Sequence, residues 1–191
     1  MSALAAFSHQ EARTAPPAPE HRDVSDTQVS ATQVADTLAS NTRPAAQNIL
    51  AAARSRAQAE SLPFAGSVPP PDAWALVSAG AAVLVDVRTA EERKFVGHVP
   101  ESLHVAWATG TAMQRNPRFV RELEAKVSKD QAVLLLCRSG KRSAAAAEAA
   151  TKAGFNQAFN VLEGFEGELD LQGQRGHQDG WRHHGLPWMQ D

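Results

Sequence analysis

Three short and almost entirely apolar runs recur between residues 82 and 162 of the chain, with segments of helical character between them. The runs are Ala82–Val87, Ala132–Leu136 and Ala158–Leu162. Apolar runs of this length are typical of strands that are buried on both faces of a sheet. Strands of this kind that alternate with helices predict an α/β domain with a parallel sheet.

The segments between these runs carry signals for the starts and ends of helices. Thr89 is suited to the N-cap of the helix that follows it, which has two glutamates in its first turn. Gly80 and Gly154 are suited to the left-handed turn that ends a helix. We also expect a short strand at His104–Trp107. The expected helices are Ala73–Ala79, Ala90–Val96, Asn116 to about Val127, and Ser143–Ala153.

The distribution of glycine and tryptophan divides the chain. All 12 Gly lie at or after Gly66, and all 4 Trp follow it. Residues 1–44 are rich in Ala, Ser, Thr, Gln and Pro, and we expect them to be mostly disordered because they bury too little apolar surface to offset their ordering entropy. Pro44 is suited to the first turn of an N-terminal helix over residues 45–61. Residues 62–191, including a Trp-rich C-terminal tail, are expected to form the folded domain.

Charge and cysteine content argue against several classes of function. With 19 basic and 21 acidic residues the formal net charge is -2, so there is no reason to expect a nucleic-acid or membrane partner. A single cysteine excludes a disulfide framework and a Cys-rich zinc site. No apolar run approaches the ~18 residues of a membrane span. Met1–Gln10 lacks the basic start and apolar core of a secretory signal, so we expect a cytoplasmic protein.

Three histidines in the C-terminal tail are candidate metal ligands. They are His177, His183 and His184, of which the last two are adjacent and would point to opposite faces of an extended segment. We therefore expect no metal and no cofactor. Trp181 and Trp188 are expected to pack onto the domain.

The only cysteine, Cys137, comes at the end of the second apolar run and directly before a helix. Parallel α/β folds place their ligand sites at this point. The helix N-terminus offers free backbone N–H groups, and Gly140 lets the loop curl around an anion. Arg138, Lys141 and Arg142 add three cations. All of these features favour the thiolate, so Cys137 is the candidate nucleophile.

The segment Cys137–Ser143, which reads Cys-Arg-Ser-Gly-Lys-Arg-Ser, resembles the active-site loop of the rhodanese family of sulfurtransferases. Other segments resemble the family in the same order along the chain: Leu84–Arg88 and Gly97–Pro100 upstream, and Asn160–Phe165 downstream. The resemblance covers about residues 68–170. It implies a rhodanese-like fold, with a central five-stranded parallel sheet and helices on both faces, and an enzyme of the thiosulfate sulfurtransferase type.

The resemblance also implies a mechanism. Cys137 attacks the outer sulfur of a small anionic donor such as thiosulfate, sulfite leaves, and the persulfide passes its sulfur to a thiol or protein acceptor of unknown identity. We rank Arg142 and Arg138 first for binding the donor, since a guanidinium can bind an oxyanion through two N–H groups. Ser143 is expected to cap the following helix. The expected anion-binding residues are Arg138, Ser139, Gly140, Lys141, Arg142 and Ser143.

Asp86, Arg88 and Glu92 are expected to support the site without taking part in the reaction. An Asp and an Arg two residues apart at a strand end could be catalytic, but we interpret them as structural. Arg88 is expected to pair with Glu92 or with the adjacent Glu91, while Asp86 holds local backbone. A cysteine that is already a thiolate needs no general base.

Two other classes of function remain open. A phosphatase or an arsenate reductase-like enzyme would use a similar loop with a Cys and an Arg, but the phosphatase loop is one residue longer. Here four residues separate Cys137 from Arg142, and the tighter loop suits a sulfur atom better than a tetrahedral phosphate. A non-catalytic rhodanese-like binding module would be marked by loss of the nucleophile, and Cys137 is present.

Overall fold

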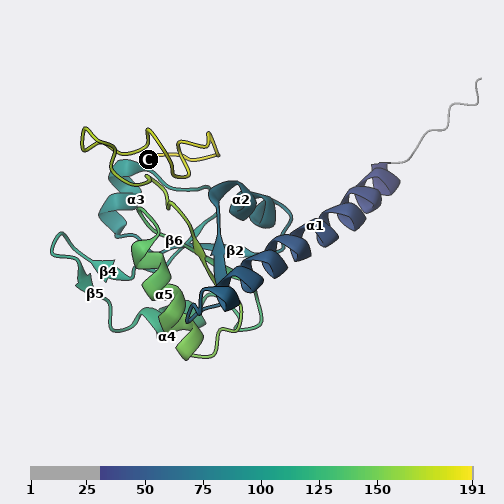
Figure 1. Cartoon of the computed structure of the whole chain (residues 1–191), viewed down its shortest axis with the longest axis horizontal. Helices are drawn as coiled ribbons and strands as arrows, with labels where there is room; N and C mark the ends of the chain where they lie inside the picture. Colours follow the sequence, from purple (N-terminus) through teal and green to yellow (C-terminus); the bar gives the residue numbers. More distant parts are fainter. Residues whose placement is uncertain (1–30, 191) are drawn as a thin grey trace, which may run out of the picture.

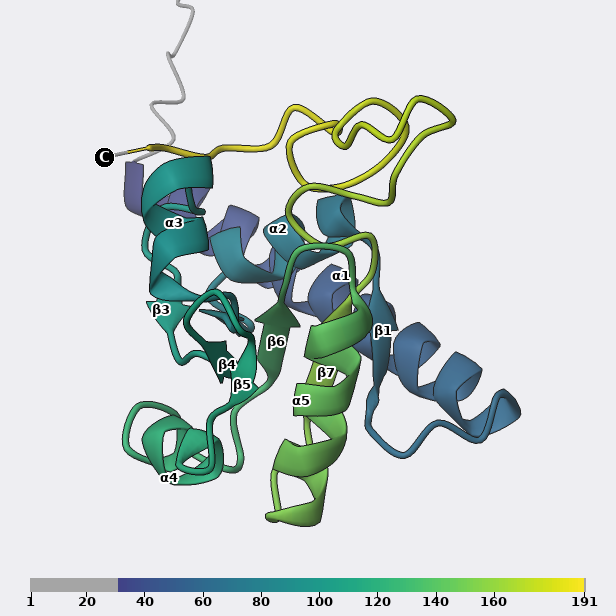
Figure 2. The same ribbon diagram turned by 90° about the vertical axis from the view of Figure 1, so that its left-hand side faces the viewer.

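A five-stranded parallel sheet forms the centre of the domain (Figures 1 and 2). The computed structural model describes the backbone of residues 31–190 and the side chains from Arg43 onward. The strands lie in the order β1-β7-β6-β2-β3, and every neighbouring pair is parallel. Their bounds are Gly66–Val68 for β1, Val83–Asp86 for β2, Leu103–His104 for β3, Val133–Leu136 for β6 and Ala158–Val161 for β7. The predicted five-stranded parallel sheet is confirmed.

Helices cover both faces of this sheet, as predicted. The helices α1 and α2 pack on one face, and α4 and α5 pack on the other. The short helix α3 buries none of its residues and follows directly after β2. The bounds are Ala31–Ala59 for α1, Pro70–Ser78 for α2, Ala90–Val96 for α3, Phe119–Glu124 for α4 and Lys141–Lys152 for α5.

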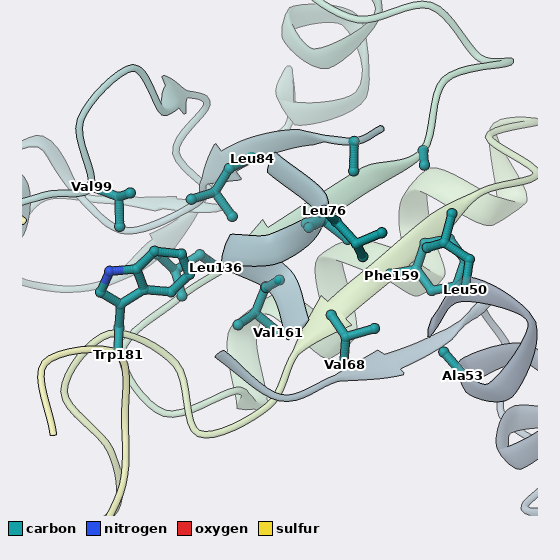
Figure 3. Close-up of a cluster of buried hydrophobic side chains, with 14 of the residues drawn as sticks. Leu50, Ala53, Val68, Leu76, Leu84, Val99, Leu136, Phe159, Val161 and Trp181 are labelled. Atoms are coloured by element: carbon teal, nitrogen blue, oxygen red, sulfur yellow. The ribbon is translucent and has the colours of Figure 1, made fainter. Parts of the chain in front are cut away.

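The alternation of side chains along β6 produces two separate cores. Successive residues of a strand point to opposite faces, so Leu134 and Leu136 pack with α1 and α2, while Val133 and Leu135 pack with α4 and α5. Figure 3 shows the first of these cores. Because all four residues are fully buried, β6 is the most protected element from which a site can be built.

The N-terminal helix begins earlier than the sequence indicates. We expected it to start after Pro44, but α1 begins at Ala31 and carries Pro44 in its interior. Residues 31–43 contain neither Gly nor Pro, so they can continue the helix across the one hydrogen bond that Pro44 removes. Figure 1 shows the N-terminal part of α1 extending beyond the domain, whereas Leu50 and Ala53, further along α1, are buried against the domain. The disorder predicted for most of residues 1–44 is therefore wrong from Ala31 onward, where the backbone is helical, and residues 1–30 lie outside the described residues.

The C-terminal tail follows β7 and closes the first core. Trp181 is fully buried, and its indole N–H donates to the carbonyl of Pro187 at 2.9 Å. Trp188 packs edge-on against Phe165 but remains 42% exposed. A hairpin of β4 (Ala108–Thr109) and β5 (Gln114–Arg115) forms a separate two-stranded sheet. None of the described helices is both long enough and apolar enough to cross a membrane.

Candidate active site

The loop from β6 to α5 begins at the carboxyl end of the central strand (Figure 2), and Cys137 is its first residue. Its side chain packs with α5 and is only 1% exposed. Its carbonyl oxygen accepts a hydrogen bond from the backbone N–H of Phe165 at 2.7 Å. The position of the nucleophile is therefore fixed by a central strand on one side and by the C-terminal segment on the other.

The loop after Cys137 leaves its backbone N–H groups available. Gly140 has a φ of 85° and is the N-cap of α5, which begins at Lys141. No backbone N–H from Arg138 to Ser143 donates to an acceptor within the part of the chain that the structure describes. A row of unpaired N–H groups at the start of a helix binds anions. The structure therefore supports the predicted anion site around Gly140.

The segment that leaves β7 forms the back of this loop. Gly164 has a φ of 68°, and a Cβ atom at this position would lie 2.5 Å from backbone atoms of Cys137, Arg138 and Ser139. The carbonyl of Arg138 accepts from the backbone N–H of Glu166 at 2.9 Å. The loop is thus packed backbone against backbone, and this contact requires a glycine.

The three loop cations have different partners. Both terminal nitrogens of Arg142 donate to the carboxylate of Glu92, at 2.6 and 2.8 Å. Lys141 is largely exposed and lies 2.9 Å from Glu168. Arg138 is exposed and forms no ion pair with any described residue. The ranking of Arg142 as a leading anion-binding residue therefore needs correction, because its guanidinium already binds a carboxylate, whereas Arg138 is free to meet a donor.

The Arg142–Glu92 pair joins the first turns of α5 and α3. Glu92 also closes a capping box with Thr89, accepting from the Thr89 backbone N–H at 2.9 Å. Burial works against the charge of Glu92, but the hydrogen bonds from Arg142 and Thr89 outweigh it and lower the pKa of this carboxyl. Burial likewise opposes the charge of Arg142, and Glu92 raises the pKa of the guanidinium despite it.

We expect Glu92→Gln to lower the free energy of unfolding by about 1–3 kcal/mol at pH 7, because a half-buried charged hydrogen bond is lost. A carboxyl whose pKa is lowered by folding stabilises the protein above its unfolded pKa of about 4.3 and ceases to do so as the pH falls through the folded value. The difference between the two proteins should therefore shrink below about pH 4.3. Urea denaturation at several pH values measures it.

The matched control is Glu148→Gln, which breaks an exposed pair between Glu148 and Lys152 on the surface of α5. An exposed pair of this spacing contributes only about 0.3–0.5 kcal/mol. Equal losses in the two variants, or a Glu92→Gln difference that persists at acid pH, would contradict the role given to the Arg142–Glu92 pair.

Arg88 has a different partner from the one expected. It does not pair with either glutamate; its Nε and Nη2 atoms bind the carboxylate of Asp86, with the shortest distance 2.7 Å. Asp86 also accepts from Arg93 at 3.0 Å, and it accepts from the backbone N–H of Arg88 as predicted. Glu92 instead binds Arg142, which lies 50 residues away in the sequence. Local spacing along the chain cannot predict a contact of this kind.

Ser143 is not the cap of α5, because the helix begins two residues earlier and Gly140 occupies the N-cap. The Ser143 hydroxyl is buried and lies 3.2 Å from the Cys137 sulfur. It also lies 2.6 Å from the side-chain oxygen of Asn160, a buried residue of β7. Sequence reasoning missed Asn160 as a site residue; a polar residue inside an apolar strand was the signal for it.

The tail histidines stay apart. His177 binds Asp170 at 2.7 Å, and His184 binds Glu163 at 2.7 Å. Among the described residues, no group of three or more His, Cys, Asp or Glu side chains is arranged to hold a metal ion.

Comparison with known proteins identifies the family to which this loop and fold belong. The sequence model of the Rhodanese-like domain matches residues 69–168, more than half of the chain. This chain belongs to the rhodanese-like family. The match contains the whole Cys137–Ser143 loop, whereas α1 and most of the C-terminal tail lie outside it.

Individual relatives agree with this assignment. The crystal structure of Rv0390 from M. tuberculosis is 46% identical, with a TM-score of 0.61 over 67% of this chain and 99% of that chain. The uncharacterized protein RP600 of Rickettsia prowazekii is 36% identical over 56% of this chain and 83% of its own length. Chloroplastic rhodanese-like domain-containing protein 15 of Arabidopsis thaliana is 30% identical over 62% of this chain and 68% of its own length. These relatives support the rhodanese-like fold and not a particular substrate.

Proposed function

We propose that this rhodanese-like protein is a sulfurtransferase that moves sulfane sulfur from thiosulfate, or another small anionic donor, through a Cys137 persulfide to a thiophilic acceptor. The Cys137 thiolate attacks the outer sulfur of the donor, the bond between the two donor sulfurs breaks, and sulfite leaves with the bonding electron pair. A thiol or cyanide then attacks the terminal sulfur of the persulfide and restores the thiolate. For the acceptor in the cell we propose only the chemical class, which is a small thiol or a protein.

The observation that carries the proposal is a row of backbone N–H groups, from Arg138 to Ser143 next to the single cysteine, that donate to no acceptor in the described residues. The terminal sulfur of a persulfide and the sulfite leaving group are both anionic. Donors that are already oriented at the start of a helix stabilise such charge without reorganising. The thiol provides the nucleophile and the loop provides the electrostatic support.

A phosphatase reading is less well supported by the geometry. Such an enzyme needs the loop arginine to hold the phosphate oxygens, and here Arg142 is bound through two hydrogen bonds to Glu92. The loop between Cys137 and Arg142 is also one residue shorter than a phosphatase loop, which likewise argues against a phosphatase. The presence of Cys137 argues against a non-catalytic binding module. A cytoplasmic location stays a prediction.

Arg138→Ala is expected to raise the KM for thiosulfate by about 3- to 10-fold and to leave kcat nearly unchanged. Arg138 is the exposed loop cation without an ion pair among the described residues, so its role is to attract the dianionic donor over a short range in water. The effect should fade at high salt, where charges are screened beyond about 3 Å at 1 M. Initial rates at low and high ionic strength measure both effects.

Lys141→Ala is the control for that experiment, because the lysine already has Glu168 as a partner and its loss removes less free charge. We expect a smaller change in KM. An unaltered KM in Arg138→Ala at low salt, or an equal change in both variants, would remove Arg138 from the donor site.

The function itself is tested by intact-mass analysis after incubation with thiosulfate. The expected result is a gain of one sulfur atom, lost again on addition of cyanide with formation of thiocyanate. Absence of the gain with thiosulfate and with a polysulfide donor would overturn the proposal. Release of phosphate from an aryl phosphate, without any gain of sulfur, would instead support the phosphatase.

A further inference from the structure

Cys137, Ser143 and Asn160 form a buried chain of hydrogen-bonding groups. The Ser143 hydroxyl oxygen lies 3.2 Å from the Cys137 sulfur and 2.6 Å from the side-chain oxygen of Asn160. The three residues come from the end of β6, the first turn of α5 and the middle of β7. At most 5% of any of them is exposed, so water does not readily replace these contacts.

A hydroxyl has one proton to donate, and Ser143 has three acceptors in range. Besides the sulfur and the Asn160 oxygen, the carbonyl of Gly140 lies 3.1 Å away. With the proton on the shortest contact, toward Asn160, the Ser143 oxygen can accept from a Cys137 thiol but cannot donate to a thiolate.

Turning the Asn160 amide reverses this chain. Its nitrogen donates to no described residue, and its oxygen binds only Ser143, so exchanging the two atoms costs no contact with another described residue. A primary amide carries both a donor and an acceptor. In the turned state the amide nitrogen donates to the Ser143 oxygen, and the hydroxyl proton becomes available to the sulfur.

We propose that Asn160 is a positioning residue that lets Ser143 follow the charge on Cys137: it accepts from Ser143 while the cysteine is a thiol and donates to Ser143 when the cysteine is a thiolate. The inference rests on the proposed function of Cys137. It applies where the sulfur atom of Cys137 itself carries charge, before attack on the donor and after discharge of the persulfide. The thiol proton is lost to solvent, and Asn160 changes no bond.

The other charges near the sulfur are the same in every variant that tests this proposal. Arg142 of α5 faces Cys137 and is held by Glu92 of α3, and Asp86 at the end of β2 acts on Arg142. The register neighbours of Asn160 are Ser67 on β1 and Leu135 on β6, neither of which is charged. Asn160 can thus be changed without removing any of these charged groups.

The test is the pH dependence of Cys137 alkylation by iodoacetamide in the full-length chain, where the only cysteine is the only thiol. Ser143→Ala should move the midpoint of the alkylation profile up by about one pH unit, because a hydrogen bond to the thiolate is lost. Asn160→Asp should move it up at least as far, since a carboxylate accepts the Ser143 proton and cannot donate. Asn160→Leu should produce a smaller upward shift.

The decisive comparison is made in the Ser143→Ala background. If Asn160 acts through Ser143, Asn160→Leu should have no effect there and Asn160→Asp should have less than half of its effect in the otherwise unaltered chain. Equal shifts in the two backgrounds would overturn the proposal, as would unshifted midpoints in variants whose thermal unfolding is cooperative. If Asn160→Asp fails to fold, the Asn160→Leu pair decides alone.

Failure of this proposal can be told apart from failure of the proposed function. Alkylation needs no sulfur donor, so the coupling between Asn160 and Ser143 is measured whether or not a persulfide forms. Absence of the persulfide in the unaltered protein would overturn sulfur transfer, whereas a persulfide together with uncoupled alkylation profiles would overturn only the role of Asn160.

Discussion

Cys137→Ser is expected to abolish both the gain of sulfur from thiosulfate and the transfer of sulfur to cyanide, lowering the rate by more than about 10³-fold. The hydroxyl of a serine is a far weaker nucleophile than a thiolate and needs an adjacent base, which the loop does not supply. Serine is small enough for the buried position, and its oxygen can form a hydrogen bond with Ser143. We therefore expect the variant to remain folded.

The unaltered protein treated with iodoacetamide is the control, because it loses the same thiol without a change of sequence. Both proteins should unfold cooperatively and should show no mass gain with thiosulfate. Sulfur transfer by folded Cys137→Ser above the rate without protein would contradict the mechanism, since the chain has no second cysteine to replace the first.

Gly164→Ala is expected to destabilise the fold by more than about 2 kcal/mol and to reduce sulfur transfer further than stability alone explains. The added Cβ would meet backbone atoms of Cys137, Arg138 and Ser139 at 2.5 Å, so the anion loop must shift. A left-handed backbone at this position costs an alanine roughly another 1–2 kcal/mol. The melting temperature should fall by about 5 °C or more.

Gly173→Ala is the control that separates the clash of a Cβ atom with the loop from the cost of a left-handed backbone. Gly173 has a similar φ of 76°, but a Cβ atom there would have no heavy atom within 4 Å. It should carry only the backbone cost and leave sulfur transfer unchanged. Thermal unfolding and initial rates with thiosulfate compare the two variants, and equal behaviour would show that the contact between Gly164 and the loop does not shape the site.

Local signals predicted most of the fold. The helix after Thr89 has the predicted bounds because its cap, its first-turn glutamates and its length all agree. The apolar runs around β2, β6 and β7 were found because both faces of each strand are buried. β1 escaped notice because it has three residues and begins with Gly66. Pro44 misled because proline favours the first turn of a helix and disfavours its interior, yet here it lies inside α1.

The sequence predicted the loop that carries the site, but not the hydrogen bonds that connect this loop to other elements. The nucleophile and the anion-binding backbone follow from a strand end, a glycine and a helix start that are adjacent in sequence. The partner of Arg142 lies on another helix, and that of Ser143 lies on the last strand, so no spacing rule reveals them. The same applies to Gly164. Position 164 has no room for a Cβ atom, and this becomes apparent only when β6 and β7 lie side by side in the sheet.

The dependence of the Cys137 loop on the segment after β7 has a consequence for biosynthesis. The backbone N–H of Phe165 donates to the carbonyl of Cys137, and the backbone N–H of Trp181 donates to the carbonyl of Gly164, which packs against the loop. Both lie downstream of the cysteine, so a nascent chain exposes its thiol before these residues have emerged from the ribosome. At roughly 5–20 residues per second that interval lasts on the order of a few seconds. During it the cysteine is open to oxidants and alkylating agents, because the loop that surrounds it in the folded protein has not yet formed.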